Sequence, residues 1–314
     1  MNNQHNLNIK INNDTTNQRI DNFIHKKFQK IPKNILYAML RTGYIKINTK
    51  KVKPYYKIQT GDILSYSNRI ILKKNNKTVI NTIIKKKFYS YILFEDKDLL
   101  IINKPTGLAV HSGSGLKFGV IEIFRLLEAN YKILELVHRI DRHTSGVLIL
   151  SKKKSVLKNL HQQFQEKKIY KSYTAIVHGV LETEKQHISI PLTKGKLTNG
   201  QKIIITNPLG KASLSIFKVK KRFKKHTLVE IIPKTGRTHQ IRVHAAYIGH
   251  PIVFDSIYGN TELDNKIHLN NYNKKILLHA SKIAFYHPRN YQKYYIYAPI
   301  ANRFIEFLKN ICGQ

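Results

Sequence analysis

Residues 138–146, His-Arg-Ile-Asp-Arg-His-Thr-Ser-Gly, place one carboxylate among several basic side chains. Acidic residues are scarce in this chain, with 18 Asp and Glu against 55 Lys and Arg, yet Asp141 stands here between two apolar runs that predict strands. Thr144, Ser145 and Gly146 favour a turn that would expose the carboxylate at the edge of a sheet. Asp141 is therefore either a loop residue that forms salt bridges with its neighbours or a carboxylate that takes part in catalysis.

The chain is strongly basic, with a formal net charge of +37 over 314 residues. The charge recurs in clusters at 85–87, 152–154 and 220–225 and at many single positions, not in one tail. This distribution favours a polyanionic partner, and nucleic acid is the leading one because Lys and Arg neutralise phosphates and release counterions. An anionic membrane surface is the rival partner, but no basic amphipathic helix stands out. We expect a nucleic-acid-binding protein without membrane contact.

Several kinds of site are disfavoured by the sequence. The single cysteine, Cys312, allows neither a disulfide framework nor a multi-cysteine metal site. His239, His244 and His250 match no common metal motif, and no glycine-rich phosphate loop is found. Residues 1–10 are polar, and no apolar run approaches the ~20 residues that span a bilayer. We expect a cytoplasmic protein with no metal and no cofactor.

The first part of the chain predicts a small RNA-binding domain. Residues 1–16 are rich in Asn and predict a disordered tail. Residues 17–80 then predict two helices, at 18–28 and 33–41, followed by short strands at 45–48, 52–56 and 63–66. This order resembles the S4 RNA-binding domain; another small α+β module is the alternative. The candidate RNA contacts are Arg19, Arg41, Lys46 and Lys51.

The rest of the chain predicts a larger domain of different design. Residues 81–88 are rich in Lys and predict a basic linker. Residues 89–314 contain many short apolar strands and few helices, without a repeated β-α-β spacing. The predicted fold class is α+β, in which the second domain has a mixed, largely antiparallel sheet.

Four segments of this second domain resemble the motifs of the RluA-type pseudouridine synthases. They are residues 103–111, 138–146, 171–179 and 235–259. Phe254 stands where many family members have glycine. That departure, together with Gly113-Ser114-Gly115 and residues 118–122, resembles one subgroup of the family, whose members modify three separate uridines of 23S ribosomal RNA.

The resemblance implies a reaction that these residue types can perform. Pseudouridylation breaks the N1–C1′ bond of a uridine within RNA, turns the uracil and rejoins it through C5. It implies that Asp141 is the catalytic carboxylate, as nucleophile or base, and that Arg242 keeps it ionised. Tyr173 would stack on the detached base, and Arg139 would fill the space that the target base leaves. The further substrate-binding candidates are Lys104, His111, Lys171, Arg237 and His239.

We therefore expect a monomeric enzyme that isomerises uridines in 23S ribosomal RNA, either free or in a large-subunit assembly intermediate. Two alternatives stay open at this point. One is the same chemistry on other ribosomal or transfer RNA uridines. The other is a catalytically silent RNA-binding protein of ribosome assembly.

Overall fold

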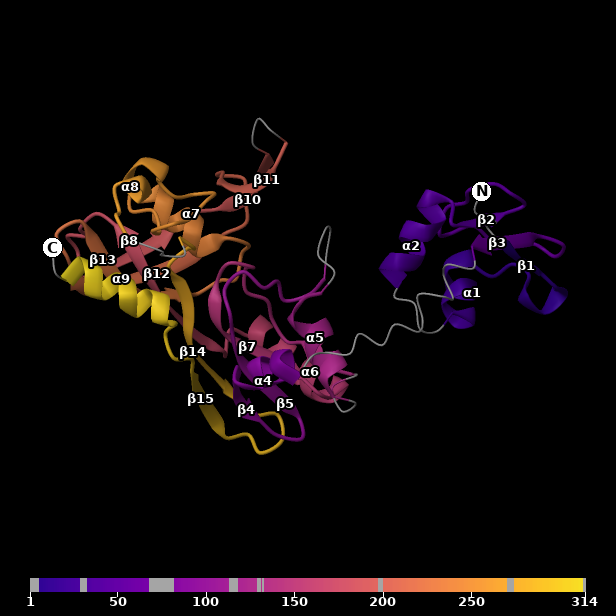
Figure 1. The fold of residues 1–314 in the computed structure, drawn as a ribbon, viewed down its shortest axis with the longest axis horizontal. Coiled ribbons are helices and arrows are strands. Elements are labelled where there is room, and N and C mark those ends of the chain that lie inside the picture. The colour runs from indigo at the N-terminus through magenta and orange to yellow at the C-terminus, as the bar shows by residue number, and fades with distance from the viewer. Residues whose placement is uncertain are drawn as a thin grey trace. The chain divides into compact units, whose positions relative to one another are not determined.

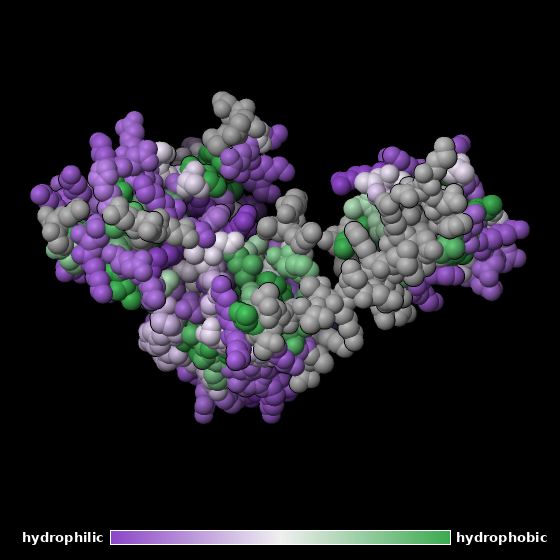
Figure 2. All heavy atoms as spheres, viewed as in Figure 1, coloured by the Kyte–Doolittle hydropathy of each residue, from purple (hydrophilic) through white to green (hydrophobic). Residues whose placement is uncertain are grey.

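The computed structural model describes residues 6–28, 33–67, 82–112, 118–128, 131, 133–196, 200–269 and 274–312. The chain divides into two compact units, residues 1–79 and 80–314 (Figure 1). In Figure 2, hydrophilic residues cover much of the visible face of unit 2, and hydrophobic residues appear among them in patches. Within the described ranges, no helix is long and apolar enough to cross a membrane.

Unit 1 contains a small sheet with two helices packed against it. Its elements are β1 (Asn6–Lys10), η1 (Asn13–Thr15), α1 (Ile20–Lys27), α2 (Lys33–Thr42), β2 (Ile45–Ile47) and β3 (Ile63–Ser67). The antiparallel strand order is β1-β3-β2. Ile20 and Ile24 of α1 are buried with Leu36 and Leu40 of α2, and this core holds the helices on the sheet.

Two expectations for unit 1 are wrong. Asn6–Lys10, inside the predicted disordered tail, pair with β3 as strand β1 because apolar Leu7 and Ile9 alternate with polar residues. Residues 52–56, predicted as a strand, form a turn against the start of α1, where the Pro54 carbonyl accepts the Asp21 N–H at 3.2 Å. Proline lacks the N–H that a ladder needs.

Unit 2 is built on one ten-stranded mixed sheet. Its strands are β4 (Ile92–Glu95), β5 (Leu99–Lys104), β6 (Glu135–Leu136), β7 (Ser145–Ser151), β8 (Tyr170–His178), β9 (Lys185–Ser189), β12 (Leu214–Arg222), β13 (His226–Pro233), β14 (Leu278–Tyr286) and β15 (Lys293–Tyr297). The order is β4-β5-β7-β14-β8-β13-β12-β9, with β15 on β14 and β6 on β7. Among these pairs, β7 with β14 is parallel and the others are antiparallel. The strands β10 (Leu192–Lys196) and β11 (Lys202–Thr206) form a separate hairpin. The expected α+β class with a largely antiparallel sheet is confirmed.

Helices cover this sheet on both faces (Figure 1). They are α4 (Thr82–Tyr89), α5 (Val120–Leu127), α6 (Lys154–Gln165), α7 (Gln240–Tyr247), α8 (Thr261–Asn265) and α9 (Asn302–Cys312). Alternate residues of β5 and β7 pack with α5 in one core and with α6 in another, so these helices lie on opposite faces. In the other half of the sheet, α7 and α9 cover opposite faces in the same way.

The predicted linker at 81–88 is wrong for its described residues, which form helix α4 at the start of unit 2. Phe88 is buried and packs edge-on to Phe124 of α5, with ring centroids 5.7 Å apart. Lys85 pairs with Glu128 at 2.8 Å. The Lys-rich composition did not predict this helix. A helix this short can pack on the domain through one large apolar side chain, here Phe88.

Candidate active site

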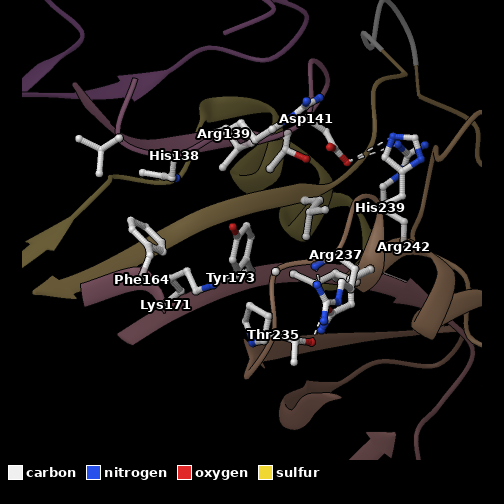
Figure 3. Close-up of a pocket in the computed structure, with 18 residues that line it drawn as sticks. His138, Arg139, Asp141, Phe164, Lys171, Tyr173, Thr235, Arg237, His239 and Arg242 are labelled. Atoms are coloured by element: carbon white, nitrogen blue, oxygen red, sulfur yellow. Dashed lines mark hydrogen bonds and ion pairs between the residues drawn. The ribbon is translucent and has the colours of Figure 1, made fainter. Parts of the chain in front are cut away.

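Unit 2 has a cavity of about 300 Å³ where three of the four sequence segments meet. Its walls come from the loop before β7, from β8, from the loop after β13 and from α7 (Figure 3). The predicted site residues that line it are Arg139, Asp141, Lys171, Tyr173, Arg237, His239 and Arg242. This volume is at the lower end of the range for small-molecule pockets.

Asp141 lies in a turn between β6 and β7, at the rim of the sheet. The Thr144 N–H donates to the Asp141 carbonyl at 3.1 Å, which closes the turn. Ile140 is buried in the core beside it, so the neighbouring side chain is directed outward. The carboxylate is 22% exposed and points across the cavity towards α7 (Figure 3).

Lys104 does not line the cavity, and its expected role in substrate binding is wrong. It is fully buried, and its Nζ donates to the carbonyls of Pro105, Leu108 and Arg142 at 2.9, 2.8 and 3.1 Å. Burial lowers the pKa of Lys104 to about 7, while three carbonyl oxygens match the three donors of an ammonium group. Lys104 therefore ties the segment 103–111 to the loop that carries Asp141.

Arg242, in the first turn of α7, faces two carboxylates. Its Nε and Nη2 donate to Asp255 at 2.7 and 2.6 Å, and its Nη1 lies 3.6 Å from Asp141 Oδ2. Burial opposes the charge of this guanidinium, but the hydrogen bonds and the attraction of both carboxylates raise the pKa of Arg242 above its usual value. The expected pairing of Arg242 with Asp141 is present as an ion pair, too long for a hydrogen bond.

Asp255 and Tyr258 were not predicted as site residues. The Asp255 side chain is 1% exposed and accepts the backbone N–H groups of Ile257 and Tyr258 at 3.0 and 3.1 Å. The ring of Tyr258 lies 5.0 Å from the Arg242 guanidinium carbon. The sequence held one signal that could have identified Asp255. It is an acidic residue directly after the apolar run Ile252–Phe254, in a chain with few acidic residues.

His239 is a second nitrogen group facing the carboxylate. It lies just before α7 in the left-handed conformation, with φ of 53°. Its Nδ1 is 2.9 Å from the Tyr258 hydroxyl, and its Nε2 is 3.9 Å from Asp141 Oδ2. Burial lowers the pKa of His239, although Asp141 acts in the opposite direction.

Tyr173 and Lys171 form the wall that comes from β8, with Phe164 and His138 beside them (Figure 3). Burial and the nearby Asp141 raise the pKa of the Tyr173 hydroxyl, so it stays protonated at neutral pH. Burial lowers the pKa of Lys171, whose Nζ lies 5.7 Å from the Phe164 ring centroid. One side of the cavity is thus aromatic and the other is charged.

The remaining predicted residues divide between the cavity and other places. Arg139 and Arg237 are exposed at the rim, and the Arg237 Nε donates to the Ala212 carbonyl at 3.1 Å. His111 is exposed and does not line the cavity, and Gly113-Ser114-Gly115 lie outside the described residues. Arg19, Arg41, Lys46 and Lys51 all belong to unit 1, and Arg19 pairs with Asp21 at 2.8 Å.

Phe254 occupies a backbone conformation that favours glycine. Its φ is 59°, in the left-handed region that large side chains rarely adopt. The buried ring packs edge-on to Phe307 of α9, with centroids 5.8 Å apart. Packing in this core compensates for the backbone strain, which explains how a bulky residue is accommodated directly before Asp255.

The chain is similar to known pseudouridine synthases. A family model described as RNA pseudouridylate synthase matches residues 98–247. A relative named ribosomal large subunit pseudouridine synthase C, from Buchnera aphidicola subsp. Acyrthosiphon pisum, is 50% identical over 303 residues and 96% of each chain. A relative of the same name from Haemophilus influenzae is 42% identical over 286 residues, 90% of this chain and 88% of its own. The solved structure of human RNA pseudouridylate synthase domain containing 4 shares the fold, with a TM-score of 0.59 and 22% identity over 73% of this chain and 96% of that one.

Proposed function

Because the chain belongs to the RNA pseudouridylate synthase family, we propose that it isomerises uridines to pseudouridines in 23S ribosomal RNA and that Asp141 is the catalytic carboxylate. One observation carries the proposal: Asp141 points into the cavity opposite Arg242, whose guanidinium is fixed by Asp255. The curated relatives at 50% and 42% identity are named for the ribosomal large subunit, which supports that RNA as the substrate.

The carboxylate must act on the ribose, either by attack on C1′ or by removal of the C2′ proton. Both routes need its ionised form, which desolvation by a bound nucleotide would disfavour. Arg242 opposes that effect because its cation lies 3.6 Å away and cannot turn aside from Asp255. The reaction is an isomerisation, so no group donor is required.

Tyr173 has a different role in this proposal. Its ring lies on the aromatic side of the cavity, where it can stack on the uracil while the base is detached. Since the raised pKa of Tyr173 keeps its hydroxyl neutral, the ring acts first as a stacking surface. Any transfer of the C5 proton to this oxygen would need a change in its surroundings after the substrate binds.

The target nucleotide must leave its stack to reach this cavity. Arg139, exposed two residues before Asp141, would enter the space that the nucleotide leaves. Lys171, Arg237 and His239 line the cavity and would bind the RNA around the target. Lys104 would hold the loop that carries Asp141 in place through its hydrogen bond to the Arg142 carbonyl.

We also propose that unit 1 is an S4 RNA-binding domain that contacts the same RNA through Arg19, Arg41, Lys46 and Lys51. The order of two helices followed by strands supports this assignment. The protein would act as a monomer in the cytoplasm, on free RNA or on an assembly intermediate of the large subunit. Modification of other uridines, and a silent assembly protein, are outcomes of the test below.

The test is tritium release from RNA labelled at C5 of uridine, because that hydrogen is lost when C5 joins the ribose. Asp141→Asn should abolish release and leave RNA affinity nearly unchanged, since binding rests on many phosphate contacts. Asp14→Asn is the matched control, because Asp14 is exposed in unit 1. Release by the Asp141 variant above an enzyme-free reaction would contradict the assignment. No release by the native chain would indicate a silent protein, and mapping pseudouridines with and without the gene would identify other targets.

A further inference from the structure

Strands β14 and β15 pair in the sheet of unit 2 (Figure 1). One face of this pair carries exposed tyrosines interleaved with lysines. Tyr295 and Tyr297 of β15 are 52% and 61% exposed. The Lys282 Nζ of β14 lies 5.3 and 4.7 Å from their ring centroids. We name this surface the tyrosine–lysine face, and it consists of Tyr170, Lys282, Tyr286, Lys293, Tyr295 and Tyr297.

Strand register places these side chains together. Lys282 is opposite Tyr297, and Tyr286 is opposite Lys293, so each pair projects to one side of the sheet. Ala284, 1% exposed, lies between Tyr170 on β8 and Tyr295 on β15 and leaves room for the rings above it. Successive rings along β15 are therefore about 7 Å apart, two strand residues.

The tyrosine–lysine face is separate from the cavity described above. Lys171 and Tyr173 of β8 line that cavity. Tyr170 alternates with them along the same strand, so its side chain projects from the other side of the sheet. A nucleotide in the cavity and a base on these tyrosines would thus be held by opposite sides of β8.

The electrostatics of the tyrosine–lysine face favour an anion that carries aromatic rings. A hydrogen bond with Tyr297 raises the pKa of Lys282, so its ammonium stays charged. Lys293 lies 5.6 Å from the centroid of Tyr295 and 5.7 Å from that of Tyr286. Glu230, an acid next to Tyr170, is already paired with Lys220 at 2.9 Å. Lysines beside the rings can contact phosphates, and the exposed sides of the rings can stack on bases.

We propose that the tyrosine–lysine face binds an unpaired stretch of RNA by stacking bases on Tyr295 and Tyr297, with Lys282 and Lys293 at the phosphates. The proposal rests on the proposed function in taking RNA as the ligand. Paired bases keep their faces inside the helix, so the surface would select single strands without reading sequence. A protein partner would not need cations between the rings, and a chain of net charge +37 favours the polyanion.

The test measures binding of a short labelled RNA of adenosine and cytidine, which contains no uridine to react. The double variant Tyr295→Leu/Tyr297→Leu should weaken binding of this single strand about thirtyfold, the lower end for the loss of two stacked bases. Tyr295→Phe/Tyr297→Phe should bind like the native chain because it keeps both rings. Tyr247→Leu is the matched control, since Tyr247 is 60% exposed on α7, and it should leave affinity unchanged.

Further readouts locate the contact. Affinity for a fully paired duplex should be the same for the native chain and the leucine variant. Lys282→Gln should reduce the slope of log affinity against log salt by about one. Ultraviolet crosslinking should attach the single strand to the peptide that contains β15. Equal thermal melting of all variants would show that the fold is intact.

Unchanged single-strand affinity in the leucine variant would overturn the proposal, and so would equal loss in the phenylalanine variant. If the leucine substitutions abolish self-association of the chain but leave RNA binding intact, the surface is a protein contact and the proposal also fails. Because the probe contains no uridine, these binding results do not depend on whether the chain catalyses the reaction. Absence of tritium release by the native chain would overturn the proposed function but would leave the binding results unchanged.

Discussion

Arg242 is the residue on which the charge balance of the site depends. It pairs with two carboxylates: the buried Asp255, which fixes the direction of the guanidinium, and the half-buried Asp141, which faces the cavity. A lone arginine beside Asp141 would have rotamer freedom, and its fork would have to be ordered when substrate binds. Asp255 orders it in advance, which is the condition for electrostatic stabilisation without reorganisation.

Replacing Arg242 should separate its two tasks. Arg242→Lys keeps the charge but cannot span both oxygens of Asp255 and reach Asp141, so the single-turnover rate should fall about tenfold to hundredfold. Arg242→Met leaves Asp255 buried without a counterion and should lower the free energy of unfolding by about 3–5 kcal/mol.

The measurements are single-turnover tritium release and urea unfolding of the same preparations. Arg237→Met is the control, because Arg237 is exposed at the rim and should affect RNA affinity more than stability. An Arg242→Lys variant with the native rate would show that the guanidinium geometry has no part in the reaction.

The sequence motifs predicted most of the residues that line the cavity. The residues that support them could be identified only from the fold. Asp141, Tyr173 and Arg242 lie in separate segments, and their convergence follows from the motif resemblance. Lys104 has the same residue type as a phosphate-binding lysine, and only its complete burial under three carbonyls reveals a structural role. The role of Asp255 could not be predicted, because its partner Arg242 lies on α7 and the two residues meet only in the folded chain.

Among the elements, the parallel junction of β7 and β14 determines where the Asp141 turn sits. Gly146 is required there, because a Cβ at this position would lie 2.2 Å from the Ala280 carbonyl oxygen. His279, fully buried next to it, lies 2.9 Å from the Ser145 Oγ and 3.1 Å from the Ala298 carbonyl. A neutral ring with Nε2 protonated donates to that carbonyl and accepts from the serine.

This junction should weaken in acid. Burial lowers the pKa of His279 to about 4, below the usual value near 6.5 that applies after unfolding. The unfolded chain therefore binds the proton first, and stability that is complete above pH 6.5 is lost as pH falls towards 4. The contribution of His279 is at most about 3 kcal/mol.

Denaturant unfolding between pH 7 and pH 4.5 tests this expectation. His279→Gln should show a smaller loss of stability over this range than the native chain. The matched control His161→Gln replaces an exposed histidine of α6 and should follow the native slope. Parallel curves for the native chain and His279→Gln would mean that the junction does not sense protonation.

Composition misled the sequence prediction mainly at short elements with few apolar residues. Strand β1 has apolar residues only at alternate positions within an Asn-rich tail, so composition predicted disorder although the period-2 pattern indicated a strand. Helix α4 docks through Phe88 among lysines. Long apolar strands such as β7, buried along its whole length, were predicted because their signal does not depend on neighbours.

At the scale of the whole molecule, the two compact units divide the proposed work between anchoring and chemistry. Every residue that lines the cavity lies in unit 2. The candidate contacts Arg19, Arg41, Lys46 and Lys51 lie in unit 1. The sequence predicted two domains from the change in element order, but it placed α4 in the linker, and that difference determines where a truncation can be made.

Deletion of residues 1–79 should leave the chemistry intact, because it retains α4 and all of unit 2. The expected loss is weaker RNA affinity and a shallower salt dependence, in proportion to the phosphate contacts removed. It should differ between target uridines, since a second anchor helps most where the target region itself binds poorly. Single-turnover rates at saturating enzyme should stay close to those of the full chain.

Deletion of residues 1–90 is the informative comparison, because it also removes Phe88 and uncovers Phe124. This variant should unfold more easily by about 3 kcal/mol, the lower end for loss of a large buried aromatic. The longer truncation also removes Lys85, Lys86 and Lys87, so the comparison uses stability and not RNA affinity. A fall in stability confined to the longer truncation assigns α4 to the catalytic unit. If the 1–79 deletion folds normally yet fails to react at saturation, unit 1 must contribute directly to the active site, and the division between anchoring and chemistry is wrong.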